Sequence, residues 1–215
     1  MAHVEPLNRA DLGSLEGVLA NSEAMMGFVP NSMLTMAHMP QLTMAFSLLA
    51  GTVFGADLKQ TMAAMIDSVP EDTQSDEALA PGLIQLIAYS VSLSAGCRYC
   101  QAHTSHNAHR FGISDEQLSS ILEYERSPAF TDSERAVVAV ALSAGQVPNE
   151  ANEEHFSALK AHFTERQIVQ IVGVISLFGF LNRWNDTMAT QLESIPVDFA
   201  EGHLAEQGWQ LGKHD

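Results

Sequence analysis

The residues best suited to chemistry lie close together in one short stretch. Cys97 and Cys100 are the two cysteines of this 215-residue chain, and His103 follows three positions later. At about 100° per residue, both sulfurs fall on one face of a helix in its first turn, with His103 at the edge of that face. Unpaired amide groups and the helix dipole favour a thiolate there, so we expect a lowered thiol pKa.

This arrangement suits a redox cycle between two thiols. A thiolate can attack the O–O bond of a peroxide and form a sulfenic acid, which a second cysteine condenses with to form a disulfide. The CxxC spacing places that second thiol within reach, and a histidine one turn further on can carry protons because its pKa lies near neutrality. We therefore expect a redox-active disulfide between Cys97 and Cys100 and no metal or other cofactor.

Two other interpretations of the cysteines stay open. Both can be small residues of a hydrophobic core, because buried free cysteines are common. A structural zinc ion usually takes four ligands, and ligands spaced along this one helix drift to opposite sides. A zinc site would therefore need histidines from elsewhere, such as His155 or His162.

The elements that must position these residues are helices. Apolar residues recur at helical spacing along the chain, and alternation with a period of two is nearly absent, which predicts an all-α fold. The CxxC helix is predicted over 97–110, directly after an apolar helix over 81–96 that begins with proline and ends with glycine. A long helix within 164–193 has a centre that is apolar nearly all round, so we expect it to be covered on every side.

Two capping boxes and an acidic loop mark boundaries between helices. The pairs Ser114 with Gln117 and Thr131 with Glu134 have the spacing of a capping box and predict two helix starts. The acidic residues of 71–78 and 150–154 are interpreted as solvated surface.

The charge of the chain excludes several kinds of partner. Ten Lys and Arg residues stand against 26 Asp and Glu residues, a formal net charge of −16 that repels nucleic acid and anionic lipid. The chain has no uninterrupted apolar run of 18 residues and no basic, apolar start, so we expect a cytoplasmic protein without a membrane segment. The extensive apolar helix surface predicts a homo-oligomer.

The stretch "LIAYSVSLSAGCRYCQAHTSHNAHRFGIS", 86–114, resembles the signature of the alkylhydroperoxidase D and carboxymuconolactone decarboxylase family. The resemblance implies an alkylhydroperoxidase D-like helical fold with the CxxC at a helix N-terminus, assembled as homo-trimers or homo-hexamers. It also implies a thiol-dependent peroxidase that acts on a small hydroperoxide and is reduced by a dithiol protein. Cys100 would attack the peroxide, and Cys97 would be the resolving partner.

Two positions depart from the family pattern. The relay carboxylate of the family lies twelve residues before the first cysteine, where this chain has Gln85. The family histidine commonly follows the second cysteine by four, where this chain has Thr104, which leaves His103 as the substitute. Asn182 and Asp186, one turn apart on the last long helix, form a polar patch that either holds helices together or supports the site.

Three segments follow from the resemblance, and two further functions stay open. We expect an N-terminal helical extension over 1–80 that packs on the core, a carboxymuconolactone decarboxylase-like helical domain over 81–193, and a C-terminal tail over 194–215.

The alternatives to a peroxidase are a lyase or decarboxylase acting on a small carboxylate lactone, and a non-catalytic oligomer that senses redox state. The presence of the CxxC counts against the lyase hypothesis. Gln85, which stands in place of the family carboxylate, keeps the redox-sensor hypothesis open.

Overall fold

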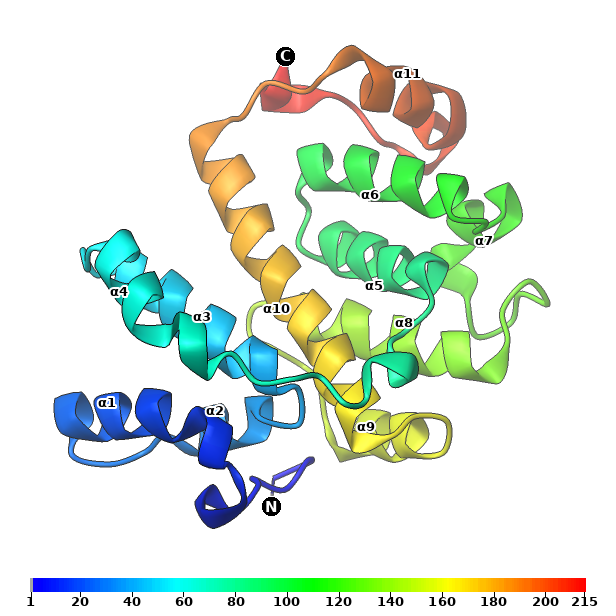
Figure 1. Ribbon diagram of the computed structural model, residues 1–215. Coiled ribbons are helices and arrows are strands. Elements are labelled where there is room, and N and C mark those ends of the chain that lie inside the picture. Colours follow the sequence, from blue (N-terminus) through cyan, green and yellow to red (C-terminus); the bar gives the residue numbers. More distant parts are fainter. Residues whose placement is uncertain (1) are drawn as a thin grey trace. The chain divides into compact units, whose positions relative to one another are not determined.

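The regular elements of this protein are helices throughout residues 2–215, the part of the chain that the computed structural model describes (Figure 1). The α-helices are α1 (Glu16–Met26), α2 (Asn31–Met36), α3 (Pro40–Val53), α4 (Leu58–Met65), α5 (Pro81–Ser94), α6 (Arg98–Arg110), α7 (Asp115–Ser119), α8 (Asp132–Ala144), α9 (Glu153–Lys160), α10 (Glu165–Met188) and α11 (Ser194–His203). Short 3₁₀ turns lie between several of them. The prediction of an all-α fold is confirmed.

Contacts between Cα atoms divide the chain into two compact units. The first holds the residues up to Ala78 together with Glu165–Val169, and the second holds Leu79–Thr164 with Gln170–Asp215. Helices α1 to α4 belong to the first unit, and α5 to α9 and α11 to the second. The segment 194–215, expected as a tail, forms α11 and two 3₁₀ turns within the second unit.

In the first unit, an ion pair holds the acidic loop to the first turn of α10. Arg166 is only 4% exposed, and its Nη2 donates to Oδ2 of Asp72 at 2.5 Å. The Gln167 side chain donates to the backbone carbonyl of Glu77 at 3.1 Å. The interpretation of 71–78 as solvated surface is therefore wrong for Asp72, because a buried guanidinium requires a charged partner.

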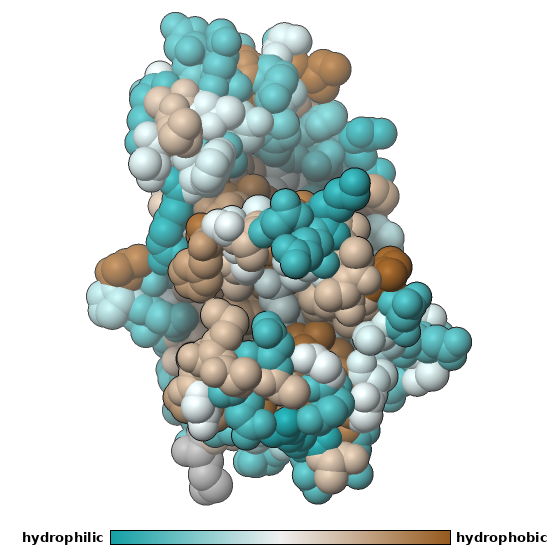
Figure 2. Space-filling view, turned by 60° about the vertical axis from the view of Figure 1, so that its left-hand side comes forward, coloured by the Kyte–Doolittle hydropathy of each residue, from teal (hydrophilic) through white to brown (hydrophobic). Residues whose placement is uncertain are grey.

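Helix α10 leaves much of its apolar surface open in the single chain. Its exposed large apolar side chains are Val172, Leu177, Phe180, Trp184 and Met188. The expectation that its apolar centre is covered on every side is not met within this chain, and Figure 2 shows apolar side chains lying between hydrophilic ones on the surface. By length and composition alone, α10 is long and apolar enough to cross a membrane. Core helices of soluble proteins meet the same criterion.

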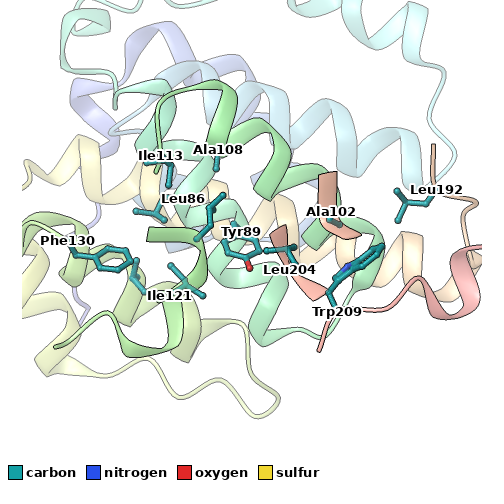
Figure 3. Packing of buried hydrophobic residues seen from close by; sticks show 13 residues of the cluster. Leu86, Tyr89, Ala102, Ala108, Ile113, Ile121, Phe130, Leu192, Leu204 and Trp209 are labelled. Atoms are coloured by element: carbon teal, nitrogen blue, oxygen red, sulfur yellow. The ribbon is translucent and has the colours of Figure 1, made fainter. Parts of the chain in front are cut away.

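The core of the second unit forms between helices α5, α6, α8 and α11. Helix α5 packs against both α6 and α8, and α11 packs on α6. Figure 3 shows how side chains from these helices and from the C-terminal segment interlock. The buried members are Leu86, Tyr89, Ala102, Ala108, Ile113, Leu118, Ile121, Phe130, Val138, Leu192, Ala200, Leu204 and Trp209.

Glycine at two positions allows this packing. Gly96 has φ of +77°, a left-handed conformation that turns the chain sharply from α5 into α6. A Cβ on Gly145 would lie 2.9 Å from the carbonyl oxygen of Val91 and from Cβ of Ser94. The end of α8 can therefore approach α5 this closely only without a side chain.

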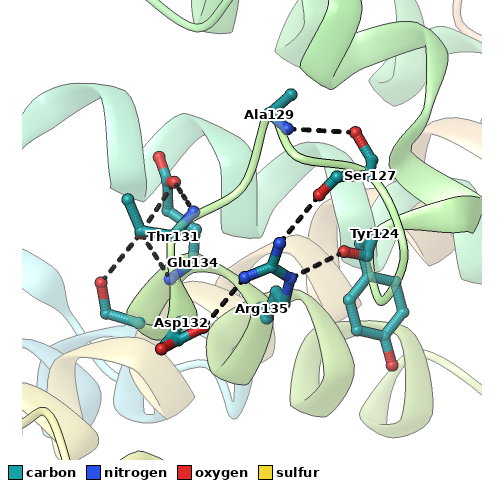
Figure 4. A network of polar contacts seen from close by, with 8 residues as sticks. Tyr124, Ser127, Ala129, Thr131, Asp132, Glu134 and Arg135 are labelled. Atoms are coloured by element: carbon teal, nitrogen blue, oxygen red, sulfur yellow. Dashed lines mark hydrogen bonds and ion pairs between the residues drawn. The ribbon is translucent and has the colours of Figure 1, made fainter.

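The start of α8 is fixed by a network of polar contacts. Thr131 and Glu134 form the predicted capping box, with the Glu134 carboxylate accepting from the Thr131 amide at 2.8 Å (Figure 4). Arg135 donates to the carbonyls of Tyr124 and Ser127 and so holds the preceding loop against the helix. The other predicted capping box, at the start of α7, is also confirmed.

Candidate active site

Cys97 and Cys100 lie at the beginning of α6. Cys97 is the residue that precedes the helix, with extended backbone angles, and Cys100 lies in the first turn. The two side chains are reduced and almost fully buried, at 1% and 3% exposure. The first turn of the helix thus holds both sulfurs out of water, next to unpaired amide groups that favour negative charge.

The two cysteine thiols differ in pKa. The Cys100 thiol donates to the Cys97 sulfur and lowers the pKa of Cys97 to about 7, against the opposing effect of burial. The backbone amides of Cys100 and Tyr99 lower it further. The same hydrogen bond, together with burial, raises the pKa of Cys100. Cys97 is therefore the more acidic of the two thiols.

The Cys100 sulfur has a second polar neighbour on α10. The side-chain amide of Asn185 donates to it at 3.5 Å, which favours negative charge on that sulfur. Asn185 is only 8% exposed. No sequence pattern singles out this residue, because an asparagine in the middle of "LNRWNDT" acquires its role only when α10 packs near α6.

The Cys97 sulfur lies beside an aspartate and a histidine. The sulfur, a carboxylate oxygen of Asp186 and a ring nitrogen of His214 all lie within 4.8 Å of one another. His214 is 1% exposed and lies in the segment that was expected to be a tail. Sequence reasoning missed it because nothing local links the chain's last residues to the CxxC.

His103 faces a different partner. Its Nε2 lies 2.7 Å from Oε2 of Glu193, and its ring stacks on Tyr99 with ring centroids 4.5 Å apart. The Tyr99 hydroxyl donates to the other oxygen of Glu193 at 3.2 Å. Burial works to raise the pKa of Glu193, but hydrogen bonds from its own amide and from His103 outweigh that effect and lower it. The three side chains hold one another in place near the outer edge of the cysteine turn.

The remaining predicted residues, Thr104, Gln85 and Asn182, make no hydrogen bond with one another within the described part of the chain. Thr104 donates its hydroxyl to the Cys100 carbonyl at 2.6 Å, within α6. The side-chain oxygen of Gln85 is buried and has no hydrogen-bond partner in residues 2–215. The side-chain oxygen and nitrogen of Asn182, which is 3% exposed, also have no hydrogen-bond partner among these residues. Of the polar patch on α10, only Asp186 reaches the cysteines, and no carboxylate stands at the position of Gln85.

The C-terminal segment packs directly over the cysteine turn. The Trp209 indole donates to the carbonyl of Arg98, the residue after Cys97, at 3.2 Å. Trp209 is 5% exposed and belongs to the core of the second unit. Access of a reagent to the buried sulfurs therefore requires either movement of this segment or a very small reagent.

We expect Trp209→Ala to speed the reaction of the cysteines with iodoacetamide by more than tenfold. Truncating a buried tryptophan costs about 3–5 kcal/mol of packing, so the segment should open more often. Trp209→Phe keeps most of the packing and is expected to react at nearly the wild-type rate. The reaction is followed by mass spectrometry of the native protein, and equal rates for wild type and Trp209→Ala would contradict the cover.

Comparison with known proteins finds a family and solved structures to which this chain is similar. A family model described as the carboxymuconolactone decarboxylase family matches residues 59–143. The crystal structure of the debrominase Bmp8 is 33% identical, covers 91% of this chain and 94% of that chain, and has a TM-score of 0.53. A Bmp8 variant with one cysteine changed to alanine, in complex with 2,3,4-tribromopyrrole, is 30% identical with a TM-score of 0.54, covering 96% of this chain and 97% of that one.

A further relative matches over a shorter range. YnjA of Escherichia coli (strain K12), an uncharacterized protein, is 28% identical over 111 residues. The match covers 51% of this chain and 60% of YnjA.

Proposed function

This chain belongs to the alkylhydroperoxidase D-like and carboxymuconolactone decarboxylase family, and from that premise we propose that it is a dithiol reductase of small electrophiles, hydroperoxides first among them. The observation that carries the proposal is the buried pair of cysteines at the start of α6. One sulfur can act as nucleophile while the other waits within bonding reach.

The hydroperoxide reaction balances with the two thiols alone. A thiolate attacks the terminal oxygen of the hydroperoxide, the O–O bond breaks, and the alkoxide leaves and takes a proton to become an alcohol. The second thiol then displaces hydroxide from the sulfenic acid, and a disulfide forms. Two electrons pass from the sulfurs to the peroxide, and a dithiol protein returns them by thiol–disulfide exchange.

We propose that Cys100 attacks and Cys97 resolves, in line with the roles that the family resemblance implies. Negative charge on the Cys100 sulfur is favoured by the donated hydrogen bond from Asn185. The greater acidity of Cys97 favours the opposite order. The single-cysteine variants described in the Discussion distinguish the two orders.

A second candidate substrate class comes from the likeness to Bmp8, which extends over nearly the whole chain. Bmp8 is a debrominase whose cysteine-to-alanine variant was solved with a bromopyrrole. In a dehalogenation, the thiolate would take the bromine as a sulfenyl bromide while the carbon takes a proton, and the second thiol would then expel bromide. The same two sulfurs and the same two electrons serve both reactions.

The rates at which the two substrates oxidise the cysteines decide between these classes. The reduced protein is mixed with one equivalent of cumene hydroperoxide or of 2,3,4-tribromopyrrole, and disulfide formation is followed by stopped flow. A lyase acting on a lactone would be insensitive to alkylation of the cysteines. A redox sensor would form the disulfide with peroxide but would not be reduced again by a dithiol protein at a useful rate.

We expect His103→Gln to lower kcat/KM for the preferred substrate by about 10²-fold, the lower end of general acid–base catalysis. The side chain is one-third exposed, is held by Glu193 and follows Cys100 by three positions, and in this proposal it passes protons between the cysteine turn and water. The matched control is His109→Gln, an exposed histidine of the same helix that pairs with Asp115 at 3.5 Å. Equal kcat/KM values for the two variants across the pH range would contradict this role.

Partners and location follow from the same proposal. The electron donor would be a dithiol protein, and the protein would act in the cytoplasm, where such donors keep thiols reduced. A homo-trimer or homo-hexamer stays our prediction, and the open apolar side chains of α10 support it. Nucleic acid and membrane surfaces are not expected partners, because the net charge is −16.

A further inference from the structure

Three electron-pair donors converge on one point beside Cys97. The Cys97 sulfur, an oxygen of Asp186 and a ring nitrogen of His214 lie within 4.8 Å of one another. They come from the start of α6, from α10 and from the C-terminal segment, and the sulfur and the imidazole are each 1% exposed. Separate parts of the second unit thus bring a thiolate, a carboxylate and an imidazole together away from water.

The imidazole of His214 is oriented with its free lone pair toward this point. Its Nδ1 lies 2.9 Å from the carbonyl oxygen of Thr190 and must carry a proton to donate to it. In the neutral ring, Nε2 then has a lone pair. Nε2 is buried, has no hydrogen-bond partner in the described chain, and lies 3.7 Å from Oδ1 of Asp186. A lone pair and a carboxylate that face each other at this distance can be bridged by a cation, either a proton on Nε2 or a metal ion.

We propose that the reduced protein binds one zinc ion, or a divalent cation of similar softness, through Cys97, Asp186 and His214. Thiolate, carboxylate and imidazole are the ligands that zinc takes in proteins, and three protein ligands with one open position are typical of sites that are not purely structural. Across a tetrahedral zinc with bonds of about 2.0–2.1 Å, ligand nitrogen and oxygen atoms lie about 3.3 Å apart. The 3.7 Å between Nε2 and Oδ1 is close to that value.

The neighbours of the three ligands resemble the outer shell of a metal site. The Thr190 carbonyl fixes the tautomer and the direction of the His214 ring, as a backbone carbonyl commonly does for a metal-binding histidine. Lys213 pairs with Oδ2 of Asp186 at 2.8 Å, which holds the carboxylate and leaves Oδ1 turned toward His214. The contacts from the Thr190 carbonyl and from Lys213 are already formed without a metal ion, so the ligands are oriented before binding.

The metal site would couple to the redox state of the cysteines. A disulfide consumes the Cys97 thiolate, so oxidation by hydroperoxide forms the S–S bond, yields alcohol and hydroxide, and releases the zinc ion with its charge unchanged. Zinc would in turn hold Cys97 and slow disulfide formation. The metal site itself does not depend on the proposed function, whereas this redox coupling rests on it.

The experiment measures metal binding directly, without turnover. Fully reduced, metal-free protein is titrated with Zn²⁺ by calorimetry and with Co²⁺ by absorption, where a thiolate ligand gives a near-ultraviolet charge-transfer band. We expect one ion per chain and the charge-transfer band. We expect Asp186→Asn and His214→Gln each to weaken Zn²⁺ binding by more than the 10–100-fold that loss of an outer-shell partner costs.

Matched variants keep the test decisive if one variant fails to fold. His109→Gln is expected to bind Zn²⁺ as the wild type does, while Cys97→Ser loses the charge-transfer band, with circular dichroism confirming that each is folded. Absence of Zn²⁺ and Co²⁺ binding by the wild type would overturn the proposal. So would unchanged binding by folded His214→Gln and Asp186→Asn. Turnover assays in the presence of chelator test the proposed function separately.

Discussion

Replacing Cys100 with serine lowers dithiol-dependent turnover of hydroperoxide by at least about 10³-fold, because a serine hydroxyl is not ionised near neutral pH and cannot form a disulfide. Cys97→Ser is expected to abolish sustained turnover equally, since no resolving thiol remains. The measurement is peroxide consumption with excess dithiothreitol and chelator. Turnover by Cys100→Ser at the wild-type rate would remove the basis of the proposed chemistry.

The two single variants also decide which sulfur attacks. Each reduced variant is treated with one equivalent of hydroperoxide and then with dimedone, which traps a sulfenic acid. If Cys100 attacks, Cys97→Ser gains a dimedone adduct on Cys100, while Cys100→Ser gains none at a comparable rate. The reverse result would assign attack to Cys97, the sulfur with the lowered pKa, and would contradict the order that the family resemblance implies.

Replacing Asp72 with alanine is expected to reduce the free energy of unfolding by about 3 kcal/mol. Arg166 is 4% exposed and keeps its charge, so loss of its carboxylate partner leaves a buried guanidinium without compensation. The Asp72 side chain is one-quarter exposed, which places the effect at the lower end of the range for buried pairs. Urea unfolding followed by circular dichroism measures the change.

An exposed ion pair of the same residue types provides the control. Asp132 pairs with Arg135 at 2.9 Å, but its side chain is 84% exposed. Asp132→Ala is expected to cost less than about 1 kcal/mol, because water screens an exposed pair and only a weak helix-dipole contribution is lost. Similar unfolding midpoints for the two alanine variants would show that the Arg166 pair does not stabilise the first unit.

Local signals in the sequence were sufficient for the helices around the site. The proline and glycine that bound α5, and the capping boxes of α7 and α8, act through neighbouring backbone groups, so a short window of sequence contains their physics. The helix predicted over 97–110 is observed as Arg98–Arg110 for the same reason. Cys97 and Cys100 lie close together because they are three positions apart, which is less than one turn of a helix.

The groups that surround the sulfurs could not be predicted in the same way. His214 and Glu193 approach α6 only through tertiary packing of the C-terminal segment, and neither belongs to a local pattern. Asp186 stood out in the sequence as a polar residue on an apolar helix, but its position beside Cys97 depends on how α10 packs. Asp72 was misjudged because acidic loops are usually solvated, and its partner Arg166 is distant in sequence.

The anchoring of His214 has a consequence for how the cysteine turn can be disturbed. Its imidazole is 1% exposed, and its backbone carbonyl accepts from the Leu192 amide at 2.8 Å. Loosening this anchor would displace a neighbour of the Cys97 sulfur while leaving the long helices in place. Labels attached to this segment should therefore be avoided in kinetic work.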